Sequence, residues 1–205
     1  MAMSYSNLIL ILVLALASTK MALAGDPDIL SDFIPPANNT FVDGKFFTFS
    51  GFRSLMNQIP QNFTVTKASM IEFPAVNGQS VSYALLRYPP SGLNPPHTHP
   101  RAAELLFLVS GCLQVGFVDT KNVLYNQTLF GGDMFIFPKG LVHFQFNPDT
   151  QLAATAISAF GSASAGTVSV PMSVFGSGID DGILAKAFKT DEYTIQKIKA
   201  GFPKP

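Results

Sequence analysis

The three histidines of this chain are confined to two short segments, and two of them are one residue apart. His97 and His99 lie in the segment GLNPPHTHPRAAE, and His143 lies in PKGLVHFQFN. On an extended chain, side chains two residues apart leave the same face. His97 and His99 can therefore hold one metal ion between them.

Prolines bracket this pair, and a carboxylate follows it. Pro95, Pro96 and Pro100 restrict the backbone around the two imidazoles, which reduces the entropy lost when an ion binds. Glu104 begins the next apolar run and can bring a carboxylate to the same region. His143 follows a Pro-Lys-Gly turn and can come from a facing strand.

Three imidazoles and one carboxylate form a nitrogen and oxygen ligand set without a thiolate. Such a set suits manganese, iron, nickel, copper or zinc, and it argues against copper(I) or an iron–sulfur cluster. Four protein ligands leave two positions of an octahedral ion open for water, dioxygen, superoxide or a small acid. The alternative, three unrelated core or surface histidines, stays open because H-x-H alone is a weak signal.

Composition bounds the scaffold that must position these residues. Of 205 residues, 47% are hydrophobic, 19 are Phe and 13% are charged, and the formal net charge is zero. This supplies one sizeable core and predicts one or two domains, with one favoured. No basic stripe is present, which argues against a nucleic-acid partner.

The central region predicts an all-β domain. Short apolar runs alternate with Gly, Pro, Asn and Asp, a pattern typical of a sandwich or barrel. We expect an N-terminal arm over residues 25–60, a β-barrel over 61–175 and a short α-helical extension over 176–205. Asp180 and Asp191 lie near the starts of its two helices. The expected strands span 80–88, 104–111, 113–119, 123–130, 133–138, 142–147 and 152–160.

One expected strand is apolar on both faces. The run LLFLV, residues 105–109, lacks the alternation of a strand with one solvated face. Either the C-terminal helices or another subunit should therefore cover its outer face.

The first 24 residues predict a secretory signal peptide. An unbroken apolar run of ten residues, 8–17, is too short to span a bilayer, and Ala22 to Ala24 fit a small-x-small cleavage site. The alternative is an N-terminal membrane anchor. With cleavage before Gly25, we expect a secreted protein with no membrane contact.

Secretion agrees with three glycosylation sequons, at Asn38, Asn62 and Asn126. The chain has a single cysteine, Cys112, so no intrachain disulfide can form. Its apolar neighbours predict a buried, inert thiol.

The two histidine segments together resemble the two cupin boxes of plant germins and germin-like proteins, and the similarity extends over nearly the whole chain after residue 25. The first box comprises Gly92, Asn94, Pro95, Pro96, His97, His99, Pro100, Arg101, Glu104 and Gly111. The second comprises Gly132, Asp133, Pro138, Gly140, His143 and Asn147.

This resemblance implies a single cupin jelly-roll β-barrel with a helical C-terminal extension. It implies that His97, His99, Glu104 and His143 bind a manganese ion inside the barrel. It also implies a homohexamer, a trimer of dimers, in the extracellular matrix, that is, the apoplast or cell wall. Members of the family oxidise oxalate, dismutate superoxide or have no assigned activity, and the family is linked to defence and wall remodelling.

The chain departs from the family pattern at three places. Ile34 lies where germins have a disulfide cysteine, so the arm should be held by packing alone or be looser. Ser91 replaces the first of two glycines, a minor change if Gly92 suffices for the turn. Oxalate oxidases of the family place two asparagines around the substrate, and here Asn94 matches one while Ala84 replaces the other. Losing that donor would cost about 1.5–3 kcal/mol of binding to a charged substrate.

Further residues could line the pocket. Gln145 shares the face of His143 in a strand and is expected near the metal, as is Asn94. Asn147 is expected to satisfy backbone groups. Arg101 is expected either to pair with an acid at the mouth or to be solvated.

These observations favour a secreted manganese protein with redox activity of the superoxide dismutase type. A small anion or oxygen species would reach the metal, and no general base would be needed. Two alternatives stay open: an oxalate oxidase that releases hydrogen peroxide, and a non-enzymatic, metal-stabilised matrix or receptor-like glycoprotein.

Overall fold

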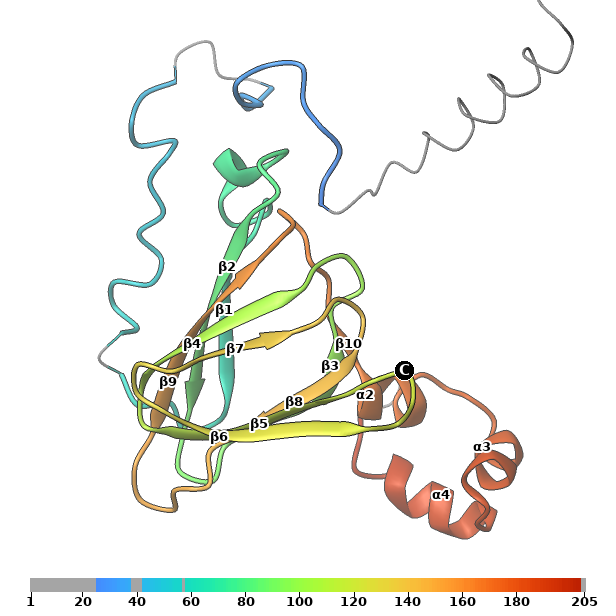
Figure 1. Ribbon diagram of the computed structural model, residues 1–205. Helices are drawn as coiled ribbons and strands as arrows, with labels where there is room; N and C mark the ends of the chain where they lie inside the picture. Colours follow the sequence, from blue (N-terminus) through green and yellow to red (C-terminus); the bar gives the residue numbers. More distant parts are fainter. Residues whose placement is uncertain (1–24, 38–41, 57, 204–205) are drawn as a thin grey trace, which may run out of the picture.

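The computed structural model describes residues 25–37, 42–56 and 58–203 (Figure 1). The predicted signal peptide and the Asn38 sequon lie outside these residues. Two five-stranded antiparallel sheets face one another as a jelly-roll β-barrel, and three short helices follow it. The predicted fold class is therefore confirmed.

The first sheet has the strand order β1-β2-β9-β4-β7, and the second has the order β10-β3-β8-β5-β6. The first contains β1 (Thr64–Ala68), β2 (Ser82–Tyr88), β9 (Ala154–Phe160), β4 (Glu104–Ser110) and β7 (Met134–Phe137). The second contains β10 (Val168–Ser169), β3 (Leu93–Thr98), β8 (Val142–Phe146), β5 (Cys112–Val118) and β6 (Leu124–Phe130). A short 3-10 helix, η1 (Pro74–Val76), connects β1 to β2.

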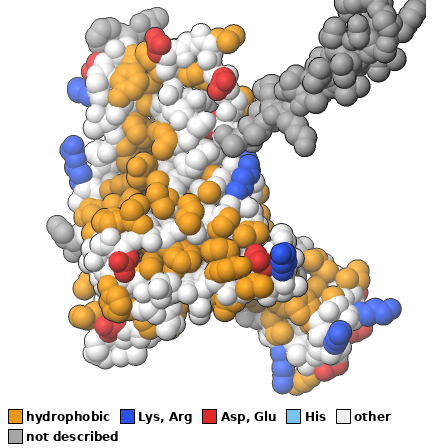
Figure 2. All heavy atoms as spheres, in the orientation of Figure 1, with side chains coloured by type: hydrophobic (Ala, Val, Ile, Leu, Met, Phe, Trp, Pro, Cys, Tyr) orange, Lys and Arg blue, Asp and Glu red, His pale blue; other side chains and the backbone are white. Residues whose placement is uncertain are grey.

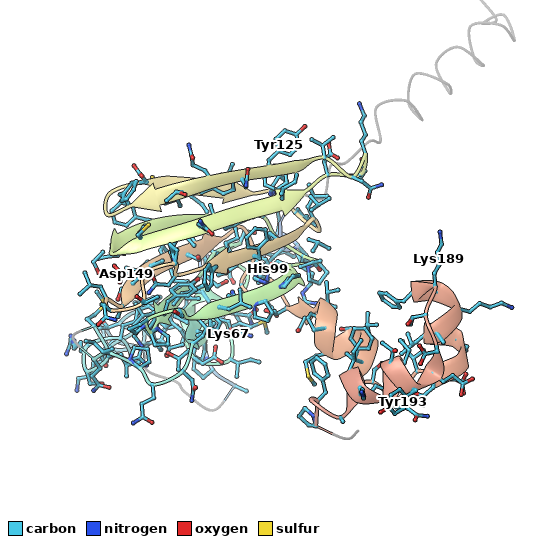
Figure 3. The ribbon with its side chains drawn as sticks, turned by 90° about the horizontal axis from the view of Figure 1, so that it is seen from below. Lys67, His99, Tyr125, Asp149, Lys189 and Tyr193 are labelled. Atoms are coloured by element: carbon cyan, nitrogen blue, oxygen red, sulfur yellow. The ribbon has the colours of Figure 1, made fainter. Side chains whose placement is uncertain are left out.

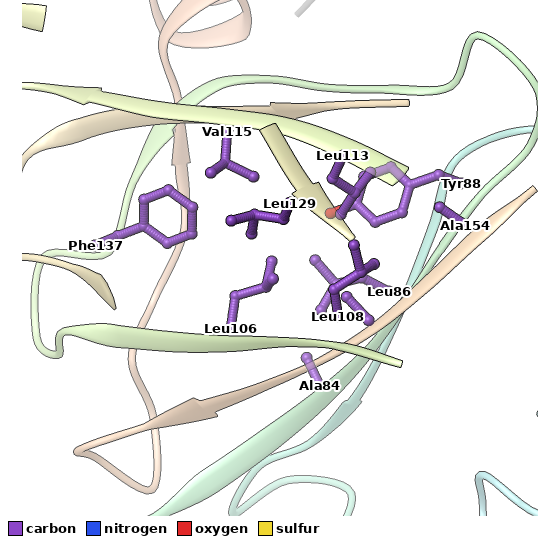
Figure 4. Packing of buried hydrophobic residues seen from close by; sticks show 11 residues of the cluster. Ala84, Leu86, Tyr88, Leu106, Leu108, Leu113, Val115, Leu129, Phe137 and Ala154 are labelled. Atoms are coloured by element: carbon purple, nitrogen blue, oxygen red, sulfur yellow. The ribbon is translucent and has the colours of Figure 1, made fainter. Parts of the chain in front are cut away.

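Alternation along the strands builds the core between the sheets. In β4, Leu106 and Leu108 are fully buried, whereas Leu105 and Phe107 are partly exposed on the outer face. Burying one such leucine contributes about 1.5–3 kcal/mol. Side chains from both sheets complete the cluster in Figure 4: Ala84, Leu86, Tyr88, Leu113, Val115, Leu129, Phe137, Ala154 and Ala156.

The seven expected strands are all present, but three others were not identified as strands. β3 contains Pro95 and Pro96, which lack the N–H that a ladder needs. Its pairing with β8 is irregular between Asn94 and His97, and this irregularity accommodates the prolines. β1 and the two-residue β10 are edge strands with little apolar alternation.

The N-terminal arm is held by hydrogen bonds, contrary to the expectation of packing alone. The Asp26 carboxylate accepts from the Ser162 hydroxyl and from the Ala163 N–H, both at 2.6 Å. Farther along, Gln79 Nε2 donates to the carbonyl of Asp32 at 3.0 Å. These contacts attach the arm to the rest of the chain at Asp26 and Asp32.

The turn before β3 also differs from expectation. Ser91, in the place of the family's glycine, adopts a left-handed φ of 58°. Gly92 has no positive φ, but a Cβ there would lie 2.6 Å from Pro89 Cδ. The replaced glycine is thus the one whose conformation disfavours a side chain, so the substitution is not neutral.

The C-terminal helices form a small cluster of their own beside the barrel (Figures 1 and 3). They are α2 (Val170–Phe175), α3 (Asp181–Phe188) and α4 (Glu192–Lys199), and α2 was not expected. The Asp180 and Asp191 side chains cap α3 and α4 by accepting from backbone N–H groups at 3.1 and 2.9 Å, as predicted. No helix in the described part of the chain is long and apolar enough to cross a membrane.

The helices pack on one another and leave the outer face of β4 open. Leu184, Ala185 and Ile195 form their core with Val174 and Phe175. We expected either the C-terminal helices or another subunit to cover the outer face of residues 105–109. The C-terminal helices do not cover it. In Figure 2, hydrophobic side chains gather over this face of the barrel.

Candidate metal centre

Three strands and one loop bring the predicted ligands to one point inside the barrel. His97 on β3 is the cross-strand partner of His143 on β8, and His99 directly follows β3. Glu104 is the first residue of β4 in the opposite sheet. One donor atom from each of the four lies within 4.8 Å of all the others, and all four residues are buried.

Each imidazole is oriented by a backbone carbonyl. Nδ1 lies 2.8 Å from the Pro95 oxygen in His97, 2.5 Å from the Gly166 oxygen in His99 and 2.9 Å from the Leu141 oxygen in His143. A carbonyl only accepts, so each Nδ1 carries the proton and each Nε2 presents a lone pair. The sequence did not predict this tautomer control, because it depends on main-chain positions.

These lone pairs face the carboxylate. Glu104 Oε2 lies 2.9 Å from His99 Nε2 and 3.1 Å from His143 Nε2. With Nδ1 protonated, each contact needs a cation between its two atoms: either a proton shared by Nε2 and the carboxylate, or a metal ion. The donor set and its orientation therefore fit a transition-metal ion, with ligand types shared by manganese, iron, nickel and zinc.

The charge states suit a cation as well. Burial, followed by the neighbouring His143, lowers the pKa of His97 to about 4, so its imidazole is neutral at physiological pH. Burial opposes the ionisation of Glu104, but contacts with His143 and His99 outweigh it and lower the pKa to about 2. The pocket thus offers a neutral nitrogen from His97 and an anionic oxygen from Glu104.

A buried amide network surrounds the carboxylate. Gln145 Oε1 accepts from Asn94 Nδ2 at 2.6 Å and from the Tyr88 hydroxyl at 3.4 Å. This fixes the amide so that Gln145 Nε2 faces Glu104 Oε1 at 3.5 Å. Ser158 donates to the same carboxylate oxygen at 2.5 Å. Asn94 and Gln145 therefore lie beside the ligands, as predicted.

Tyr88 and Ser158 were not predicted as site residues. Both are fully buried, and most of the other buried residues of β2 and β9 are apolar. The sequence did contain a signal for them. Side chains alternate between the two faces of a strand, and Tyr88 and Ser158 are polar residues at positions of β2 and β9 that face the core. Burial, followed by the charge of Glu104, raises the pKa of Tyr88 well above its ordinary value, so its hydroxyl keeps its proton.

Three other expectations are resolved by contacts. Asn147 is fully buried and donates to the carbonyls of Pro89 and Leu152, as expected for a residue that satisfies backbone groups. Arg101 is exposed, in line with the expectation of a solvated side chain, and it donates to Ser164; within the described residues it pairs with no acid. Cys112 is half-buried rather than buried.

A cavity of about 420 Å³ leads from the ligands to solvent. It lies between the edge strand β1 of one sheet and β3 of the other, and we call this opening the seam. His97, His99 and Glu104 line it together with Asn94. A small molecule can thus approach the ligand cluster from this side. Its remaining lining comes from Val65, Lys67, Ser69, Ile71, Glu72, Ser82, Tyr83, Ala84, Leu86, Arg101, Phe160 and residues 164–167.

The barrel and its three-histidine, one-glutamate cluster define a cupin, and a model of the cupin family matches residues 53–196. Germin-like protein 9-3 of Oryza sativa subsp. japonica is 62% identical over 210 residues, which span 98% of each chain. Putative germin-like protein 9-2 of the same plant is 58% identical over 212 residues, 100% of this chain and 99% of the relative. The chain belongs to the germin-like family of cupins.

Among solved structures, an oxalate oxidase is similar in fold. It superposes with a TM-score of 0.78 at 32% identity and covers 86% of this chain and 97% of its own. A second oxalate oxidase structure, in complex with the substrate analogue glycolate, also has a TM-score of 0.78, at 31% identity.

Proposed function

We propose that the protein binds manganese through His97, His99, Glu104 and His143 and carries out redox chemistry on a small anion. The observation that carries this proposal is the convergence of three Nε2 lone pairs and one carboxylate oxygen within 4.8 Å. Manganese is preferred over the other metals that suit this set on the strength of the family resemblance. When bound, the ion would supply one-electron chemistry between two oxidation states.

Superoxide dismutation is the activity that the surrounding residues support best. All three histidines of the chain are in the ligand set, so none is left as a general base. The Gln145 amide would hold the Glu104 carboxylate in place, and Ser158 would stabilise its charge. The cationic side chains Lys67 and Arg101 line the seam and would favour the entry of an anion.

The direct test is superoxide dismutation by the manganese-loaded protein. We expect activity that is lost in the His97→Ala and Glu104→Ala variants. Full activity of the metal-free protein would overturn the proposal.

Oxalate oxidation is the second candidate, because oxalate oxidase structures are similar in fold. Asn94 is present beside the ligands, but Ala84 lines the cavity with only a methyl group. We expect weak peroxide release from oxalate and a gain of about tenfold or more in Ala84→Asn, the equivalent of one restored hydrogen bond to a charged group. No gain would contradict this role for Ala84.

We further propose that the mature protein is secreted to the plant apoplast or cell wall and acts in defence or wall remodelling. The apolar N-terminal run and the sequons support secretion, and Asn62 and Asn126 are both exposed. Assembly as a trimer of dimers is supported by the uncovered apolar face of β4.

A further inference from the structure

One lysine faces the inside of the barrel at the seam. Lys67 on β1 pairs with Ala84 on β2, and Ala84 pairs with Ser158 on β9. Cross-strand partners point to the same face of a sheet. Ser158 contacts Glu104, so this row runs from the ligand cluster outward to Lys67. Figure 3 labels Lys67 and His99, which both line the cavity.

The row gives the cavity a length. Neighbouring strands lie about 4.8 Å apart. The backbone of Lys67 is therefore one strand spacing from that of Ala84 and two strand spacings from that of Ser158. Val65 and Leu86, which are also cross-strand partners, and Phe160 form an apolar wall in the same cavity. A molecule that touches both ends must therefore have an apolar middle.

The volume points in the same direction. A cavity of about 420 Å³ lies within the range of about 300–1,000 Å³ typical of sites for organic ligands. Superoxide has two atoms and oxalate has six heavy atoms, so either would leave most of this space empty. Ala84, at the middle of the row, has only a methyl group and so leaves space in the cavity that a larger side chain would fill.

The charge of Lys67 is available to a ligand. Within the described ranges, no carboxylate lies within 4 Å of its ammonium group. Glu72 also lines the cavity, and Lys67 is close enough to help lower the pKa of its carboxyl group. Its Oε2 atom accepts from the Ser69 hydroxyl at 2.5 Å and from the Ser69 N–H at 3.1 Å, which holds the carboxylate beside Ser69. Arg101 keeps its charge but is held against Ser164, so Lys67 is the cavity cation whose ammonium group has no side-chain partner among the described residues.

We propose that the site takes a dicarboxylic acid longer than oxalate. One carboxylate lies at the ligand cluster beside Asn94, the carbon chain lies against Val65 and Leu86, and the second carboxylate pairs with Lys67. Lys67 is then a residue that determines specificity. The inference rests on the proposed function only in requiring the bound cation.

The test is calorimetric binding to the manganese-loaded full chain, without turnover. The probes are oxalate, malonate, succinate and glutarate, with acetate, propionate, butyrate and valerate as monoacids of matched length. We expect succinate or glutarate to bind more tightly than oxalate and up to about fivefold more tightly than its monoacid, the upper value for one partly exposed charge pair.

Variants assign the second carboxylate to Lys67. Lys67→Met should abolish the preference for the diacid over its monoacid, whereas Lys121→Met, in the exposed turn between β5 and β6, should leave that preference unchanged. Glu72→Gln should strengthen diacid binding. Circular dichroism melting of each variant verifies folding.

Tightest binding of oxalate, no binding of the longer acids, or an unchanged preference in Lys67→Met would each overturn the inference. Metal content is measured first, so failure of the metal site is seen separately. Diacid binding without superoxide dismutation would refute the proposed dismutase activity and leave this inference standing.

Discussion

The proton on each histidine is placed by the main chain. Carbonyls of Pro95, Gly166 and Leu141 hold the three Nδ1–H groups and turn the Nε2 lone pairs inward. This makes the cluster a cation site, and it also makes the empty cluster sensitive to pH.

We predict that the metal-free protein loses stability in mild acid. Burial, followed by His143, lowers the pKa of His97 from 6.5 to about 4, so the unfolded chain takes up a proton in this window that the folded chain does not. The free energy of unfolding should therefore fall by about 3 kcal/mol as the pH decreases from 6.5 to 4. The lowered pKa of Glu104 extends the fall from pH 4.5 to about 2.

Urea denaturation across this pH range measures the effect. His97→Gln, which cannot titrate, should remove most of the slope between pH 6.5 and 4. An equal slope in both proteins would show that another group is responsible.

At the scale of elements, the turns and strand registers decide which side chains meet. The histidine pair and Glu104 could be predicted because their residue types are informative and their spacing is local. His143 could be predicted because it is the one other histidine of the sequence. Ser158 and Lys67 could not, because their roles depend on pairing across β9, β2 and β1, which no local pattern specifies. Helix α2 was missed because six residues, mostly apolar, are too few to separate a helix from a strand by period.

The strained turn before β3 gives a prediction at this scale. Ser91 has a φ of 58°, a conformation that costs a residue with a side chain about 1–2 kcal/mol. Glycine avoids this cost, but it loses about 0.5–1 kcal/mol more chain entropy on folding. Ser91→Gly should raise the free energy of unfolding by up to about 1 kcal/mol. Ser91→Ala is the matched control and should give no gain. A destabilised Ser91→Gly protein would contradict this account of the turn.

The whole molecule carries an apolar face that its own helices leave open. Leu105 and Phe107 on β4 are 38% and 39% exposed, and their partners Ile136 and Met134 on β7 are 51% and 56% exposed. Contiguous apolar patches of this kind mark association surfaces. The described helices pack elsewhere, so we propose that a second copy of the chain covers the patch.

Phe107→Lys should weaken this association, because a charge would be buried in an apolar contact. Sedimentation velocity should show a smaller particle than for the unchanged protein. Leu152→Lys alters an equally apolar but isolated loop residue, 65% exposed, and should leave the size unchanged. Assembly unaffected by Phe107→Lys would place the interface elsewhere.

The measurement that bears most directly on the central claim is elemental analysis of the protein purified from its own tissue, together with Glu104→Gln and His97→Ala proteins. Changes in outer-shell partners alone weaken metal affinity about 10–100-fold, so loss of a ligand should remove the ion during purification. We predict one manganese ion per chain in the natural protein and almost none in the variants. A natural protein without a transition metal, or variants that retain a full equivalent, would contradict the account.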